Sequence, residues 1–83
     1  MARPWNHFNK REAREVIAKT IGLNTTKVGD DQTFRSVGAD ELDIVNAYNA
    51  LEQKYGTHIP LEYSPDITFG ELIGFVENQR SQS

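Results

Sequence analysis

Apolar residues repeat with a helical period near the start of this 83-residue chain. They occupy positions i, i+3, i+4 and i+8, which lie on one face of a helix: Ala13, Val16, Ile17 and Ile21. Asn9 can cap the first turn, with Glu12 three residues later to complete a capping box, and Gly22 can take the left-handed position that ends a helix. The pattern predicts a first helix from about Lys10 to Ile21.

A long polar stretch, residues 24–39, follows this helix and contains two glycines and two adjacent aspartates. We expect three of its few apolar residues, Val28, Phe34 and Val37, to be buried in the core. A loop of more than about 12–15 residues is uncommon, and when ordered it usually has a function. This loop leads directly to Asp40.

Asp40 is a natural N-cap for a second helix, which Gly56 ends at about Tyr55. The inward face is predicted to consist of Leu42, Val45, Tyr48 or Asn49, Leu51 and Tyr55, with Ile44, Ala47 and Ala50 beside it. Tyr48 has two interpretations. Its ring either fills space inside the domain, or its hydroxyl reaches solvent at the edge of the helix.

Two further helical signals follow an extended segment, Ile59-Pro60-Leu61. Ser64 can act as an N-cap with Pro65 at the first helical position, which predicts a short third helix at Ser64-Pro65-Asp66. Thr68 and Glu71 form another capping box before a last helix that ends at about Gln79. Its apolar residues again repeat with a helical period: Phe69, Leu72, Ile73 and Val76.

These elements predict an all-α fold, a four-helix bundle with a long loop between helices one and two and a short third helix. One domain is expected to span residues 1–83. Its core covers about residues 9–79, between a flexible N-terminal segment and a frayed C-terminal tail.

Composition narrows the possible functions. The chain has no cysteine, which excludes a disulfide framework, a thiolate metal site and a cysteine nucleophile. Its net charge of −3 argues against nucleic acid or an anionic membrane surface as a partner. No apolar run approaches the ~20 residues that span a bilayer, and the N-terminus does not resemble a secretory signal. We therefore expect a cytoplasmic monomer.

The loop meets the second helix at Gly38-Ala39-Asp40-Glu41-Leu42. This run resembles the attachment site of acyl carrier proteins, in which Gly-x-Asp-Ser-Leu opens the second helix. The resemblance covers about residues 12–78, and its other parts come in the family's order: Val16-Ile17 through Ile21-Gly22-Leu23, Phe34, Ala50 to Tyr55, His58-Ile59-Pro60 and Ile67-Thr68.

In that family the serine carries 4′-phosphopantetheine, whereas here Glu41 takes its place. The resemblance thus implies a carrier-like domain that lacks the acceptor serine and holds no cofactor. It would be a non-enzymatic protein-interaction or regulatory module, with an acyl-processing or synthase enzyme as partner. The alternative is a specialised acyl carrier protein of fatty-acid or polyketide-type biosynthesis, with atypical attachment or an altered residue at position 41.

The candidate partner-binding residues are Asp40, Glu41, Leu42, Asp43 and Glu52. A purely structural role competes with this interpretation, because acids in a first helical turn stabilise it by roughly 0.3–1 kcal/mol each. Two further departures from the family bear on binding. The stretch between Phe34 and Gly38 is one residue shorter than usual, and Asn46, Asn49 and Gln53 occupy surface where carrier proteins are typically acidic.

Other chemistry finds little support. Asp30 and Glu41 are spaced like the ends of a calcium loop, but Phe34 and Arg35 occupy positions that require a ligand and a glycine. His7 and His58 have no further ligands at metal-like spacing. The hydroxyls of Ser36, Ser64 and Thr68 lack the Asp-x-Leu context of an acceptor. No catalytic residue and no metal ligand is predicted.

Overall fold

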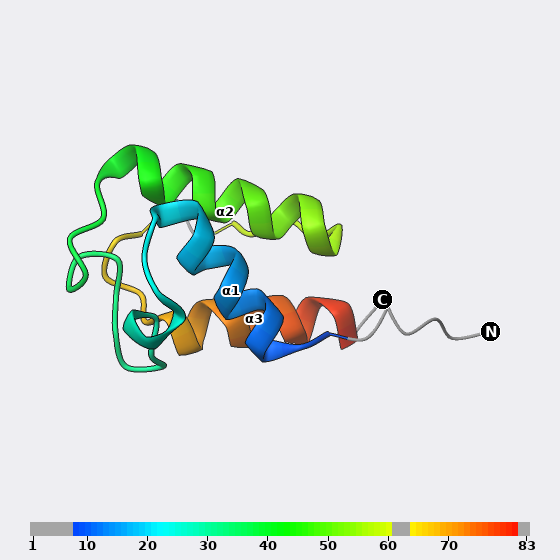
Figure 1. The fold of residues 1–83 in the computed structure, drawn as a ribbon. Coiled ribbons are helices and arrows are strands. Elements are labelled where there is room, and N and C mark those ends of the chain that lie inside the picture. The colour runs from blue at the N-terminus through cyan, green and yellow to red at the C-terminus, as the bar shows by residue number, and fades with distance from the viewer. Residues whose placement is uncertain (1–7, 61–63, 82–83) are drawn as a thin grey trace.

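The computed structural model describes residues 8–60 and 64–81 of the chain. Within these ranges it contains three α-helices and one short 3₁₀-helix: α1 (Lys10–Ile21), η2 (Thr25–Lys27), α2 (Glu41–Tyr55) and α3 (Phe69–Ser81). In Figure 1, α2 and α3 run in the same general direction, and α1 crosses between them in the opposite sense. The chain from α1 to α2 passes around the end of the bundle where α2 begins.

The bounds of α1 agree with the prediction at both ends. The Asn9 side chain accepts hydrogen bonds from the backbone N–H groups of Arg11 and Glu12. At the other end Gly22 has a φ of 75°, and the Leu23 N–H donates to the Ala18 carbonyl at 2.8 Å. This bond closes the helix with the left-handed turn that a glycine favours.

The core is built from one face of each helix and from the long loop. Its buried side chains are Ala13, Ile17, Ala18, Val28, Phe34, Ile44, Ala47, Tyr48, Leu51, Tyr55, Ile59, Phe69, Leu72, Ile73 and Val76. The predictions for Val28 and Phe34 are confirmed, whereas Val37 is only partly buried. The predicted apolar face of the last helix is buried throughout.

The inward face of α2 differs from the prediction. It consists of Ile44, Ala47, Tyr48, Leu51 and Tyr55, while Val45 is only partly buried and Leu42 is exposed. Leu42 and Leu51 are nine residues apart, which is about half a turn out of phase on a helix of 3.6 residues per turn. Burying Leu51 therefore turns Leu42 towards solvent.

Tyr48 is fully buried, so the first of its two interpretations holds. Its ring lies 6.0 Å from that of Phe34, which in turn packs edge-on against Phe69 at 4.9 Å. Phe34 comes from the loop and Phe69 from α3. The three rings thus join the loop, α2 and α3 in one aromatic cluster, here defined as Phe34, Tyr48 and Phe69.

The short third helix is absent from the described part of its segment, where residues 65–67 form a bend. Two contacts with the long loop fix the backbone there. The Arg35 N–H donates to the Pro65 carbonyl at 3.1 Å, and Thr68 forms an isolated antiparallel bridge with Thr33. Backbone groups that pair with the loop cannot also close a helical turn, so the Ser64-Pro65 signal is overridden.

The last helix begins as predicted and ends later. Thr68 and Glu71 form the expected capping box, with the Glu71 N–H donating to Thr68 Oγ1 and the Thr68 N–H donating to Glu71 Oε1. The helix continues to Ser81, two residues past the predicted end at Gln79. Of the residues discussed above, His7 and Leu61 lie outside the described ranges, as do residues 1–7 of the predicted N-terminal segment and residues 82–83 of the predicted tail.

Gly70 marks a close approach between α3 and the long loop. A Cβ atom at this position would lie 3.0 Å from the Asp30 carbonyl oxygen and 3.1 Å from its Cβ atom. The Gly70 N–H also donates to that carbonyl at 3.1 Å. A side chain here would force backbone atoms apart.

We predict that Gly70→Ala lowers the free energy of unfolding by about 1–3 kcal/mol, the usual cost of overpacking. The matched control is Gly74→Ala on the same helix, where a Cβ meets nothing within 4 Å. That variant should gain up to about 1 kcal/mol from helix propensity. Urea unfolding of both variants measures the difference, and equal effects would contradict the close approach.

Candidate protein-interaction surface at the start of α2

The first turn of α2 is fixed by a capping box that the sequence signal only half revealed. Asp40 Oδ1 accepts the Asp43 N–H at 2.9 Å, and Asp43 Oδ2 accepts the Asp40 N–H at 3.4 Å. The Asp-x-x-Asp spacing could have indicated this reciprocal pair, as Ser-x-x-Glu does elsewhere. Both carboxylates therefore act first as helix caps.

Glu41 and Leu42 occupy the next two positions and point away from the core. Both residues are exposed to solvent. Leu42 is 66% exposed, and among the described residues it is the only large hydrophobic one that is exposed. A single exposed leucine is ordinary on a protein surface. Here it stands between the carboxylates of Glu41 and Asp43 at the positive end of a helix dipole.

The loop before α2 is folded into consecutive turns. Gly38 has a φ of 78°, its N–H donates to the Arg35 carbonyl at 3.1 Å, and the Ala39 N–H donates to the Phe34 carbonyl at 3.0 Å. Because Phe34 is buried, these bonds fix the position of the start of α2 relative to the core. Gly38 permits the left-handed backbone that the turn requires.

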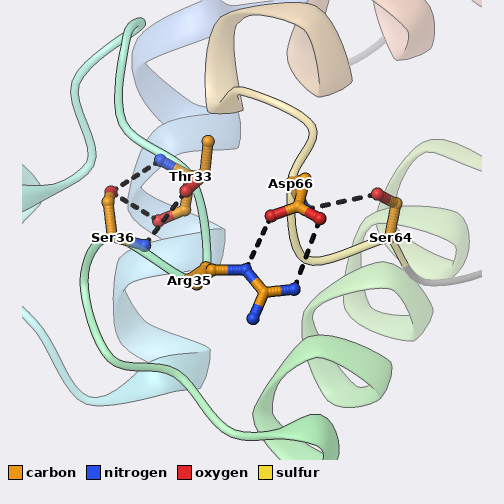
Figure 2. Close-up of polar contacts among 5 residues, drawn as sticks. All are labelled: Thr33, Arg35, Ser36, Ser64 and Asp66. Atoms are coloured by element: carbon orange, nitrogen blue, oxygen red, sulfur yellow. Dashed lines mark hydrogen bonds and ion pairs between the residues drawn. The ribbon is translucent and has the colours of Figure 1, made fainter.

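Arg35 joins this loop to the segment before α3, as Figure 2 shows. Its Nε donates to Asp66 Oδ1 at 2.7 Å and one terminal nitrogen donates to Asp66 Oδ2 at 3.3 Å. These hydrogen bonds, reinforced by the guanidinium charge, lower the pKa of the Asp66 carboxyl and raise the pKa of Arg35. No local sequence pattern indicates this pair, because its members are 31 residues apart.

Glu52 is separated from the other predicted site residues. It lies eleven positions after Glu41 on the same helix, which is about 16 Å along the axis at 1.5 Å per residue. Its carboxylate accepts the Ile59 N–H at 2.8 Å and lies 3.4 Å from His58 Nδ1. The structure brings Asp40, Glu41, Leu42 and Asp43 together and places Glu52 at the exit of α2.

The three hydroxyls considered as acceptors take part in turns and caps. Ser36 Oγ accepts a hydrogen bond from the Thr33 N–H at 2.9 Å and donates one to Gln32 Oε1 at 2.7 Å. Figure 2 shows the turn that contains Thr33 and Ser36. Ser64 Oγ accepts the Asp66 N–H at 3.2 Å. Thr68 caps α3. Within residues 8–60 and 64–81, no group of three or more histidines and carboxylates could hold a metal ion.

One known protein family matches most of this chain. A family model described as "Phosphopantetheine attachment site" matches residues 11–76, most of the chain. The chain belongs to this phosphopantetheine-attachment family. An acyl carrier protein of Sulfurovum sp. (strain NBC37-1) is 35% identical over 69 residues, which cover 81% of this chain and 92% of that protein. The resemblance found in the sequence is confirmed.

Family membership fits the all-helical domain that the structure describes. The matched range begins in α1 and ends in α3, so it includes the long loop and the whole of α2. None of the helices that the structure describes is both long and apolar enough to cross a membrane.

Replacing Asp40 tests the capping box. We predict that Asp40→Ala lowers the free energy of unfolding by about 1 kcal/mol, because the Asp43 N–H loses its acceptor. Asp31→Ala, which removes an exposed carboxylate from the preceding loop, should change it by less than about 0.5 kcal/mol. Thermal or urea unfolding compares the two, and losses of equal size would count against Asp40 as the cap.

Acid should weaken the Arg35–Asp66 pair. Because the pKa of Asp66 is lowered by folding, its contribution is complete above the unfolded pKa and disappears as the pH falls through the folded pKa. Arg35 stays charged throughout this range. We predict that the wild type and Asp66→Asn differ in unfolding free energy at pH 7 and converge between about pH 4 and pH 2. A difference that is constant over this range would contradict the linkage, and Asp31→Asn controls for loss of surface charge.

Proposed function

We propose that this chain is a carrier-family domain that binds a protein partner through the first turn of α2 and does not carry phosphopantetheine. Glu41 is the observation that carries the proposal. It is the first residue of α2, directly after the Asp40 cap, where the family resemblance places the acceptor serine. A glutamate side chain has no hydroxyl, so a phosphodiester to the prosthetic group cannot form on it.

The negative charge of Glu41 determines the electrostatic property of the proposed surface. A serine modified by phosphopantetheine would carry a phosphodiester charge at this helix end, and Glu41 supplies a permanent negative charge at the same place. The helix dipole stabilises that charge. We infer that the domain resembles a modified carrier electrostatically, without a thiol or an acyl group.

The residues of this surface have different parts in the proposal. Glu41 and Leu42 are exposed and make the direct contacts, a carboxylate beside an apolar side chain. Asp40 and Asp43 add negative charge while their oxygens hold the capping box. Glu52 has a lesser part, because its side chain is only 24% exposed and its carboxylate already accepts the Ile59 N–H.

The partner that fits such a surface has an apolar recess with basic groups around it. We infer an acyl-processing or synthase enzyme, because such enzymes act on carrier proteins. The domain would recruit or regulate this enzyme without being its substrate, as a non-enzymatic monomer. The engagement of Ser36, Ser64 and Thr68 in turns and caps supports the absence of a substitute acceptor.

A specialised acyl carrier protein of fatty-acid or polyketide-type biosynthesis is the second candidate. The similarity to a relative named acyl carrier protein over 92% of its length favours it. This candidate requires either a different attachment residue or an altered residue at position 41. It makes the opposite prediction for covalent modification.

Coexpression with a broad-specificity phosphopantetheinyl transferase separates the two candidates. We predict that the intact mass of the wild type stays unchanged, because position 41 offers no nucleophilic oxygen. Glu41→Ser should gain the mass of one phosphopantetheine if the α2 turn is presented to the transferase, and Glu41→Ala should not. A covalently modified wild type, located by peptide mapping, would refute the proposal and establish the second candidate.

A further inference from the structure

Two segments far apart in sequence are fastened to each other beside the α2 surface. One is the approach loop, residues 33–39, and the other is here named the strap, residues 64–68. Thr33 and Thr68 form an antiparallel bridge, and the Arg35 N–H donates to the Pro65 carbonyl at 3.1 Å. The guanidinium of Arg35 adds the two bonds to Asp66 that Figure 2 shows.

The strap and the loop share the aromatic cluster. Phe34 precedes Arg35 in the loop, Phe69 follows the strap, and both rings are fully buried. The Tyr48 hydroxyl lies 3.5 Å from the Ser64 carbonyl oxygen at the other end of the strap. Close packing of these rings means that a movement of the strap is transmitted to the loop.

Arg35 also connects directly to the start of α2. Its carbonyl accepts the Gly38 N–H at 3.1 Å, and Gly38 stands two residues before the Asp40 cap. Arg35 thus bonds to the strap through its backbone N–H and its guanidinium. Its backbone carbonyl bonds to the turn before α2. Replacing the side chain removes the guanidinium bonds to Asp66 and leaves both backbone bonds in place.

Solvent reaches the pair freely. The side chains of Arg35 and Asp66 are each 68% exposed, so ions and charged groups of other molecules can compete for either one. An exposed ion pair is weak, even with two hydrogen bonds. Such a pair opens readily without unfolding the domain.

We propose that Arg35 and Asp66 form a solvent-accessible latch that couples the strap to the first turn of α2. Charges that compete for either side chain would loosen the strap and change how Glu41 and Leu42 are presented. The functional value of this coupling rests on the surface proposed above. The coupling itself is internal to the chain, so its test requires no partner and is independent of the phosphopantetheine experiment.

Amide NMR and hydrogen exchange on the full chain test the latch in Arg35→Gln and Asp66→Asn. We expect exchange at residues 66–70 to be about two- to five-fold faster in both variants, and the amide resonances of residues 38–43 to shift. The charge-swapped double variant, Arg35→Asp with Asp66→Arg, should restore the wild-type pattern. Salt added to the wild type should move the same resonances, because it screens the pair.

The control is a second exposed ion pair, Lys10 with Glu77, whose charged atoms are 3.7 Å apart at the other end of the bundle. Lys10→Gln should leave residues 38–43 and 66–70 unchanged. The proposal is overturned if the changes in the latch variants stay within the neighbours of residues 35 and 66, or if Lys10→Gln produces the same changes. It is also overturned if the swapped variant restores nothing.

Discussion

The burial of Phe34 is the contact on which the arrangement of this domain depends. The loop that contains it joins α1 to α2, and its ring packs against Tyr48 of α2 and Phe69 of α3. α2 and α3 contact each other less than either contacts α1. A ring inserted from the loop therefore supplies contact that the two helices do not make directly, and it gives a long polar segment a defined path.

That defined path determines the candidate surface. Once Phe34 is buried, the carbonyls of Phe34 and Arg35 accept the N–H groups of Ala39 and Gly38 and bring the chain to Asp40 in the orientation of a helix cap. The capping box then leaves Glu41 and Leu42 directed to solvent. Surface and core are thus linked by a few residues of backbone, which is why a chain with a small core can still present a defined surface.

The two ends of α2 are held by different chemistry. At its end the Tyr55 hydroxyl lies 3.3 Å from Glu12 Oε1 of α1, and the Tyr55 ring packs 5.1 Å from that of Phe8. At its start Ile44 is buried in the core, and the preceding loop is held by backbone turns. The proposed surface lies at the start, where Glu41 and Leu42 are exposed.

The sequence by itself determined the helices that have complete local signals. Asn9 with Gly22, Asp40 with Gly56, and Thr68 with Glu71 define starts or ends through bonds within a few residues, and all of these appear in the structure. The family resemblance also came from the sequence, because it depends on the order and spacing of short motifs. The identity of residue 41 needs no coordinates at all.

Only the tertiary structure decided the rest. It turned Leu42 outwards because Ile44, Tyr48 and Leu51 define the buried face, and it placed Tyr48 in the core. It replaced the predicted helical turn at Ser64-Pro65-Asp66 with a bend, since Arg35 and Thr33 offer partners that a local pattern cannot reveal. Contacts between residues some thirty positions apart have no signature in spacing, and here they outweigh a weak local preference.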